Sequence, residues 1–216
     1  MQVGSNNLKI MKTLATYLLI LLQACSYAQG QTAMRDMAYK QLIALSQGTL
    51  LVQLPEYKNT IDAMRKADAK KADQFAAELN TMHQQIISAF NSYYTYSKVY
   101  YFYASNTQLV IDKNFTRTIL DAQLQPGKFV ADGNALFIAT FGQTDPDYAA
   151  RTENYKNNYK ANNISLSGLI IHTDKMVPCQ KPFPYIIRTH ETGQIISDKK
   201  IIKAVKQLQK KLKKGF

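Results

Sequence analysis

A long amphipathic segment between two short apolar runs constrains this fold more than any other feature of the sequence. From Tyr57 to Tyr93 the apolar residues recur mostly at steps of three and four, which is the spacing of one helical face. A continuous helix of that length would span roughly 54 Å, more than a small domain is wide. Because Asp68 also interrupts the apolar face, the segment predicts two helices, or one kinked helix, with a break near residues 66–70.

The runs on either side of this segment are typical of buried strands. Residues 49–54 are mostly apolar, and residues 98–103 are rich in aromatic side chains. A strand, a helical segment and a second strand form a βαβ unit over residues 49–104, in which the strands are parallel and the crossover is right-handed. We interpret the tyrosines of the second strand as core residues rather than as a stacking surface for sugars or nucleic acid.

Three further apolar runs complete a predicted sheet of about five strands. Residues 135–141, 164–173 and 184–188 have the length and composition of strands. A helix is predicted between the first two of these runs, over residues 145–159, because Asp and Pro residues begin it and tyrosines recur along it at near-helical spacing.

The order of these elements indicates one α/β domain with a mixed sheet over residues 29–216. A helix that ends at Gly48 precedes the βαβ unit, and an amphipathic helix that begins after Ser197 closes the chain. No linker or internal repeat divides this domain. The element order is similar to that of thioredoxin-like proteins, which makes their topology one candidate arrangement.

Residues 1–28 have the composition of a signal peptide that directs export. Met11 begins a short basic region, and it is a second candidate for the start of translation. An apolar core of nine residues from Leu14 to Leu22 follows, and small residues before Gln29 fit cleavage by a signal peptidase. The leader resembles those of bacterial envelope proteins. Its core is too short to span a bilayer as a stable helix, and no second apolar stretch approaches that length.

A lipid anchor is the alternative fate of this leader. The sequence Leu22-Gln23-Ala24-Cys25 resembles the lipobox of bacterial lipoproteins, and that resemblance implies that Cys25 is lipidated and becomes the first mature residue. After cleavage behind Ala28, Cys179 is the only cysteine left. No internal disulfide is then available, so packing must hold the fold together.

Four residues near the ends of the last strands are the candidates for chemistry. His172 and Asp174 lie at the end of one strand, His190 lies at the end of the next, and Cys179 lies in the proline-containing loop between them. Polar residues at strand ends can converge on one site in an α/β protein. The spacing matches no metal motif, Cys179 has no Cys-x-x-Cys partner, and the chain has no glycine-rich phosphate loop. We therefore expect neither a metal nor a cofactor, and we favour structural roles for these residues and for His83.

The last helix concentrates the positive charge of the chain. Residues 198–214 carry eight lysines and one aspartate, whereas the whole chain has a formal net charge of +12, or +10 without the leader. Lysines without interleaved aromatic residues do not suit nucleic-acid recognition, and export makes that partner unexpected. We favour a solvated face, with contact to an anionic membrane surface as the alternative. The candidates for that contact are Lys199, Lys203, Lys206 and Lys210.

The sequence favours an exported, non-catalytic binding or accessory protein of the bacterial envelope, either periplasmic or secreted. The alternative comes from a different class of protein. It is a cofactor-free hydrolase or a thioredoxin-like enzyme with a site near His172, Asp174, Cys179 and His190.

Overall fold

Five strands form one mixed sheet with parallel strands at its centre. The computed structural model describes residues 32–126, 129, 135–144, 167–179, 181–189 and 194–215. The strands are β1 (Thr49–Leu54), β2 (Lys98–Tyr103), β3 (Leu136–Gln143), β4 (Ser167–Thr173) and β5 (Ile186–Arg188). Their order across the sheet is β2-β1-β3-β4-β5. Strand β1 is parallel to β2 and to β3, whereas β4 is antiparallel to β3 and to β5. The predicted α/β domain with a mixed sheet and a parallel βαβ unit is confirmed.

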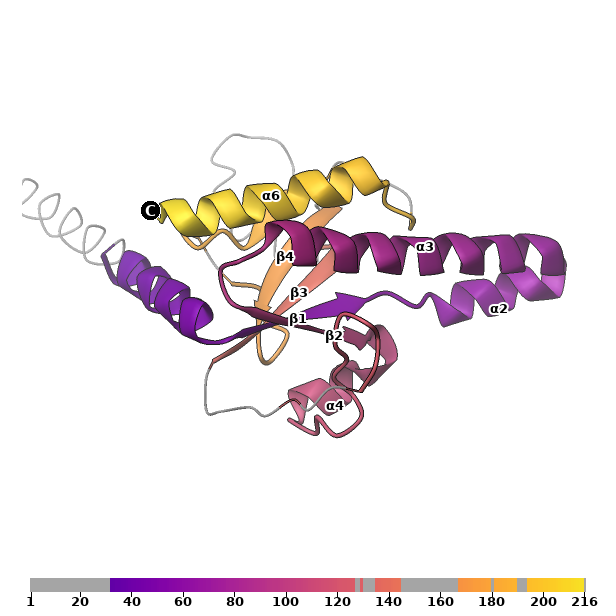
Figure 1. Ribbon diagram of the computed structural model, residues 1–216, viewed down its shortest axis with the longest axis horizontal. Coiled ribbons are helices and arrows are strands. Elements are labelled where there is room, and N and C mark those ends of the chain that lie inside the picture. The colour runs from indigo at the N-terminus through magenta and orange to yellow at the C-terminus, as the bar shows by residue number, and fades with distance from the viewer. Residues whose placement is uncertain are drawn as a thin grey trace, which may run out of the picture.

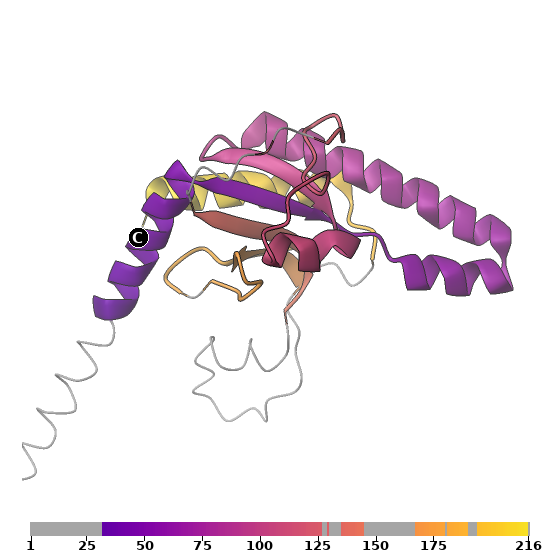
Figure 2. The ribbon, with the colours of Figure 1, turned by 90° about the horizontal axis from the view of Figure 1, so that it is seen from below.

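Two long helices cover one face of this sheet, and a short helix lies on the other. Helices α3 and α6 pack against each other above the strands, whereas α4 lies below them (Figure 1; Figure 2). The helices are α2 (Lys58–Ala67), α3 (Ala69–Tyr93), the 3₁₀ turn η1 (Ala104–Asn106), α4 (Thr107–Ile111), α6 (Asp198–Lys214) and a first helix over residues 32–47.

The predicted break in the long helical segment is confirmed at Asp68. Helix α2 ends at Ala67, and Asp68 has extended backbone angles. Its carboxylate then accepts a hydrogen bond from the backbone N–H of Lys71 at 3.1 Å, which caps the start of α3. The two helices form a hairpin that projects beyond the sheet (Figure 1). The N-terminal part of α3, which lies in this hairpin, therefore packs on α2 rather than on the strands.

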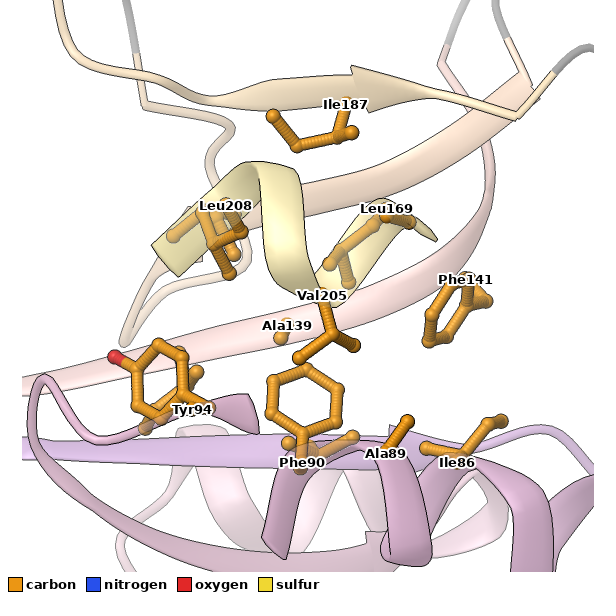
Figure 3. Packing of buried hydrophobic residues seen from close by; sticks show 14 of the residues in the cluster. Ile86, Ala89, Phe90, Tyr94, Ala139, Phe141, Leu169, Ile187, Val205 and Leu208 are labelled. Atoms are coloured by element: carbon orange, nitrogen blue, oxygen red, sulfur yellow. The ribbon is translucent and has the colours of Figure 1, made fainter. Parts of the chain in front are cut away.

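The sheet face under α3 and α6 holds the larger core. Phe90 of α3 lies between the strands and α6, where Val205 approaches it (Figure 3). Both side chains are fully buried, and burial of each contributes roughly 1.5–3 kcal/mol to folding. The strands contribute alternate residues to this core, as expected for a sheet with two covered faces. They include Leu50, Val52, Tyr101, Phe137, Ala139, Phe141, Leu169, Ile171 and Ile187.

The opposite face is covered mainly by α4 and by turns that follow it rather than by a long helix. A second core of Leu51, Phe102, Val110, Ile119 and Ile138 lies there. Residues 112–126 also protect the outer edge of β2, because Tyr101 and Leu120 exchange two backbone hydrogen bonds of 2.9 and 2.8 Å. With both faces covered, Tyr101 and Phe102 are fully buried. The interpretation of the tyrosines of β2 as core residues is confirmed for Tyr101, whereas Tyr100 and Tyr103 are half-buried.

Gly48 ends the first helix, as the sequence predicts. A side chain at this position would collide with the backbone carbonyl groups of Ala135 and Ala44. The absent side chain lets β1 begin directly beside Ala135, whose carbonyl accepts the N–H of Thr49 at 3.0 Å. Gly48 is therefore required by close approach of two backbone segments.

Several sequence predictions fall outside the described residues. They concern the signal peptide and the lipobox within residues 1–28, the helix over residues 145–159, and His190.

Candidate functional site

The structure places His172 and Cys179 on opposite faces of the sheet. His172 of β4 pairs with Ile138 of β3, so both side chains lie on the face that α4 covers. Cys179 belongs to the core on the other face, beside β4, where its N–H donates to the carbonyl of Ile171 at 2.9 Å. Direct proton transfer needs hydrogen-bond distance between the two side chains. The intervening sheet prevents that contact.

Burial makes Cys179 a poor nucleophile. Its side chain is 1% exposed, and desolvation raises the pKa of its thiol to about 12. The thiolate is the reactive form of cysteine, and it is scarcely populated at neutral pH with such a pKa. This geometry favours a packing role for Cys179.

His172 is a neutral core histidine at physiological pH. It is 8% exposed, and burial lowers its pKa to about 4, although the nearby carbonyl of Ile138 acts weakly in the other direction. Its Nδ1 has no hydrogen-bond partner in the part of the chain that the structure describes. The carboxylate of Asp174 instead pairs with Lys113 Nζ at 3.5 Å, beside the end of α4. Among the described residues, no three His, Cys, Asp or Glu side chains converge on a possible metal position.

The lysines of α6 form one exposed face, because the apolar residues of this helix are buried. Ile201, Val205, Leu208 and Leu212 pack on α3 and the sheet. The lysines project into solvent on the opposite side, apart from Lys200, which is half-buried. The helix therefore uses its amphipathic pattern as the sequence predicts.

A groove between α6 and residues 181–188 extends this positive face. It has a volume of about 600 Å³. Lys203, Lys211 and Lys214 line it from the helix, and Lys181 and Arg188 line it from the strand side. No carboxylate is found among its described lining residues. These five residues define what we call the cationic groove.

Sequence reasoning identified only part of the cationic groove. Lys203 was a candidate, but Lys206 leans away toward α3, where its Nζ lies 4.1 Å from the centre of the Tyr93 ring. Lys181 and Arg188 were missed as partners of the helix. These two residues are distant from α6 in the sequence, and they come close to it only because β5 packs beside that helix.

Comparisons with known proteins assign no family to this chain. No protein-family model, no curated protein and no solved structure matches it. In the part of the chain that the structure describes, none of the helices combines the length and the apolar character needed to cross a membrane.

Proposed function

We propose that this chain is an exported, non-catalytic binding protein of the bacterial envelope that attaches to anionic membrane surfaces through α6. The observation that carries this proposal is the cationic groove, in which five basic side chains meet without a lining carboxylate among the described residues. Anionic lipid head groups are complementary to such a surface. The signal-peptide pattern of residues 1–28 supports exposure to an envelope membrane.

The enzyme alternative has less support. A hydrolase built on Cys179 and His172 needs the thiol and the imidazole to share a proton. Cys179 is buried with a raised pKa, and His172 lies across the sheet from it. The arrangement of these residues is explained by packing alone.

The size of the lysine contribution sets the expected strength of membrane attachment. Each basic side chain near an anionic membrane contributes about 1 kcal/mol. Removal of three of them should then weaken vesicle binding on the order of 100-fold. The attraction should also weaken steeply with salt, because the Debye length falls from about 10 Å at 0.1 M to about 3 Å at 1 M.

Co-sedimentation with vesicles tests the proposal. The protein is mixed with vesicles of phosphatidylglycerol and phosphatidylcholine, and with vesicles of phosphatidylcholine alone. We expect binding only to the anionic vesicles, loss of binding at high salt, and loss in the triple variant Lys203→Gln, Lys211→Gln, Lys214→Gln.

A matched control separates the groove from net charge. The variant Lys66→Gln, Lys70→Gln, Lys98→Gln removes the same charge from exposed positions that do not line the groove. It should bind anionic vesicles nearly as well as the unmodified chain. Equal loss in both triple variants, or no binding by the unmodified chain, would rule out a role for the groove.

Export is tested separately by the mass of the mature protein in a bacterial host. A chain that begins at Gln29 indicates signal peptidase cleavage, whereas a lipid-modified Cys25 indicates an anchored lipoprotein. Recovery of the uncleaved chain from the cytoplasm would contradict export under either mechanism.

A further inference from the structure

The sheet has a cleft beyond the carboxyl ends of β1 and β3. The crossover after β1 leads to β2 on one side, whereas β3 pairs with β1 on the other side. Where neighbouring parallel strands have connections that diverge in this way, α/β proteins bind ligands beyond the strand ends. A cleft of about 500 Å³ occurs at this position, within the size range of small-molecule sites.

Neutral polar side chains form a large part of the described lining of this cleft. Glutamine, serine and threonine residues come from five different strand ends or loops, and Tyr57 and Phe141 add aromatic surface. Among the described lining residues there is no lysine, arginine or histidine. The polar residues are Gln53, Glu56, Gln143, Ser167, Thr189 and Gln194.

Three of these polar residues form a row across the sheet. Gln143 pairs with Ser167 in the register of β3 and β4, and the N–H of Thr189 donates to the carbonyl of Ser167 at 3.1 Å. Residues opposite one another on neighbouring strands point to the same face. Their side chains therefore present an amide and two hydroxyl groups to one side of the cleft.

Thr189 is the most informative member of this row. Its side chain is 6% exposed, yet its Oγ1 has no hydrogen-bond partner among the described residues. A buried hydroxyl without a partner is unfavourable, and most buried polar groups in proteins have one. Thr189 lines the cleft, but its Oγ1 itself has less than 1 Å² of accessible surface, so a ligand hydroxyl can supply the missing hydrogen bond once the side chain turns toward the cleft.

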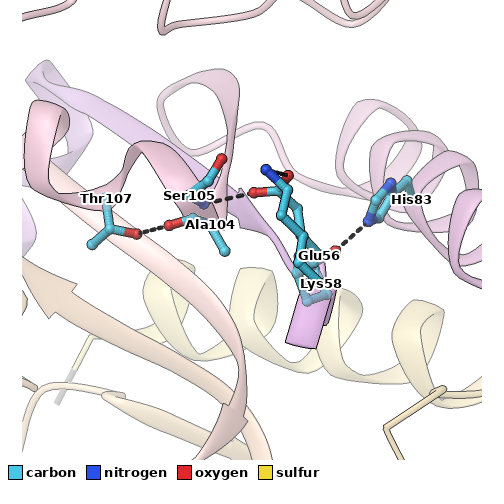
Figure 4. A network of polar contacts seen from close by, with 7 residues as sticks. Glu56, Lys58, His83, Ala104, Ser105 and Thr107 are labelled. Atoms are coloured by element: carbon cyan, nitrogen blue, oxygen red, sulfur yellow. Dashed lines mark hydrogen bonds and ion pairs between the residues drawn. The ribbon is translucent and has the colours of Figure 1, made fainter. Parts of the chain in front are cut away.

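The described lining contains one carboxylate, and the charge of a nearby lysine balances it. Glu56 accepts the backbone N–H of Ser105 at 2.6 Å and pairs with Lys58 Nζ at 3.1 Å (Figure 4). Burial alone would raise the pKa of Glu56, but the hydrogen bonds from Ser105 and the charge of Lys58 hold it below its ordinary value. Glu56 therefore remains ionised and paired, which leaves the cleft without a strong preference for a charged ligand.

Contacts within the protein hold the rim of the cleft in place. His83 of α3 is buried, and its Nε2 lies 2.6 Å from the carbonyl oxygen of Pro55, which it contacts as the hydrogen-bond donor (Figure 4). Tyr57, two residues after Pro55, has a left-handed backbone with φ of 47°. This conformation is uncommon for a residue with a bulky side chain. The ring of Tyr57 also packs edge-on against Phe75, with 6.1 Å between centroids. A rigid rim lowers the ordering cost of binding.

We infer that this cleft binds a small neutral saccharide. Hydroxyl and amide side chains, which both donate and accept, match the hydroxyl groups of a sugar. The aromatic surface of Tyr57 suits the apolar face of a pyranose ring, and Thr189 Oγ1 supplies a buried hydrogen bond. This site is separate from the cationic groove of the proposed function, and its residues do not overlap with those of that groove.

Nuclear magnetic resonance titration of the purified protein tests this inference. The probes are glucose, maltose and N-acetylglucosamine, with glucose 6-phosphate as a charged analogue. We expect saturable shifts of the amide resonances around Thr189 and Gln143 with at least one neutral sugar, at a Kd of roughly 1 mM or tighter. Glucose 6-phosphate should not bind the cleft more tightly than glucose, because no described cation lines it.

The variant Thr189→Val separates binding from folding. It replaces the unpartnered hydroxyl by a methyl group of similar shape, so the melting temperature should stay unchanged or rise. Affinity for the sugar should fall about tenfold, the effect of one lost hydrogen bond. Ser167→Ala, in the same row, should weaken binding without unfolding the chain.

Thr140→Val is the matched control. Thr140 is also a buried threonine of this sheet, but it does not line the cleft. It should leave sugar affinity unchanged. The inference is overturned if no neutral sugar shifts the cleft resonances at roughly 10 mM, about tenfold above the expected Kd. It is equally overturned if Thr189→Val and Thr140→Val lower the affinity to the same extent.

Discussion

The two faces of the sheet are covered in different ways. On one face, α3 and α6 bury a continuous core and satisfy their backbone hydrogen bonds internally. On the other face, the five-residue helix α4 and the turns of residues 112–126 cover a smaller core with fewer buried side chains. Their backbone groups need individual partners, and Lys113, Arg117 and Leu124 adopt left-handed conformations there.

This contrast indicates that two equally buried side chains can differ in how far their neighbours can move when the side chain is removed. A side chain between two packed helices and a sheet has neighbours that cannot move toward a vacated space. A side chain under irregular turns has neighbours that can relax into it. The two faces should therefore respond differently to the same substitution.

The largest expected effect compares two fully buried isoleucines. Ile86 lies in α3 on the helix face, and Ile119 lies in the turns of the opposite face, both at 0% exposure. We expect Ile86→Ala to lower the free energy of unfolding by about 4 kcal/mol and Ile119→Ala by about 2 kcal/mol, because only the second cavity can collapse. Urea denaturation at neutral pH measures both values. Equal losses, or a larger loss for Ile119→Ala, would contradict the proposed difference between the faces.

The next effect concerns pH on the face that α4 covers. The pKa of His172 is about 4 in the folded protein and near 6.5 in the unfolded chain, so the unfolded chain binds the proton more tightly. Stability is therefore fully present above pH 6.5 and falls as the pH drops to about 4, by about 3 kcal/mol. His172→Gln should remove most of this pH dependence, as measured by unfolding at pH 7 and pH 4.5. An unchanged pH profile in the variant would show that other groups are responsible.

The smallest expected effect concerns two aspartates whose carboxylates accept hydrogen bonds from backbone N–H groups. Asp121 accepts the N–H groups of Gln123 and Gln125, at 2.8 and 3.0 Å, in the irregular covering. Asp68 accepts one N–H at the start of α3. We expect Asp121→Ala to cost about 2 kcal/mol and Asp68→Ala about 1 kcal/mol in unfolding free energy.

Asp62→Ala serves as the control for charge in that comparison. Asp62 is exposed on α2, and its removal changes net charge without removing a helix cap. It should change stability by less than about 0.5 kcal/mol. A greater loss for Asp68→Ala than for Asp121→Ala would reverse the expected dependence of the irregular face on single polar contacts.

The sequence was informative where a repeating pattern extends over a whole element. The steps of three and four along residues 57–93 indicated the helices, and Asp68 indicated their break. The aromatic run at residues 98–103 indicated a buried strand, and its position after the helices indicated a parallel partner for β1. Such patterns are local consequences of backbone geometry, so a single sequence contains them.

The irregular covering of the opposite face has no comparable pattern. Residues 116–121 fit the pattern of either a helix or a strand, but they form turns, and Leu120 makes isolated bridges to Tyr101 and to Pro126. Their conformation depends on a strand edge that needs partners and on apolar side chains beneath them. Neither influence is visible within the segment itself.

The candidate site divides in the same way. The sequence by itself determined which face of α6 is positively charged. Helical periodicity places the lysines of this helix on the side opposite its apolar residues, which face the core. Only the tertiary structure decided that Lys181 and Arg188 join three of those lysines, that Cys179 and His172 lie on opposite sheet faces, and that Thr189 lines a cleft. The physical reason is that periodicity fixes which face of an element a residue occupies, whereas strand order and packing fix which elements meet.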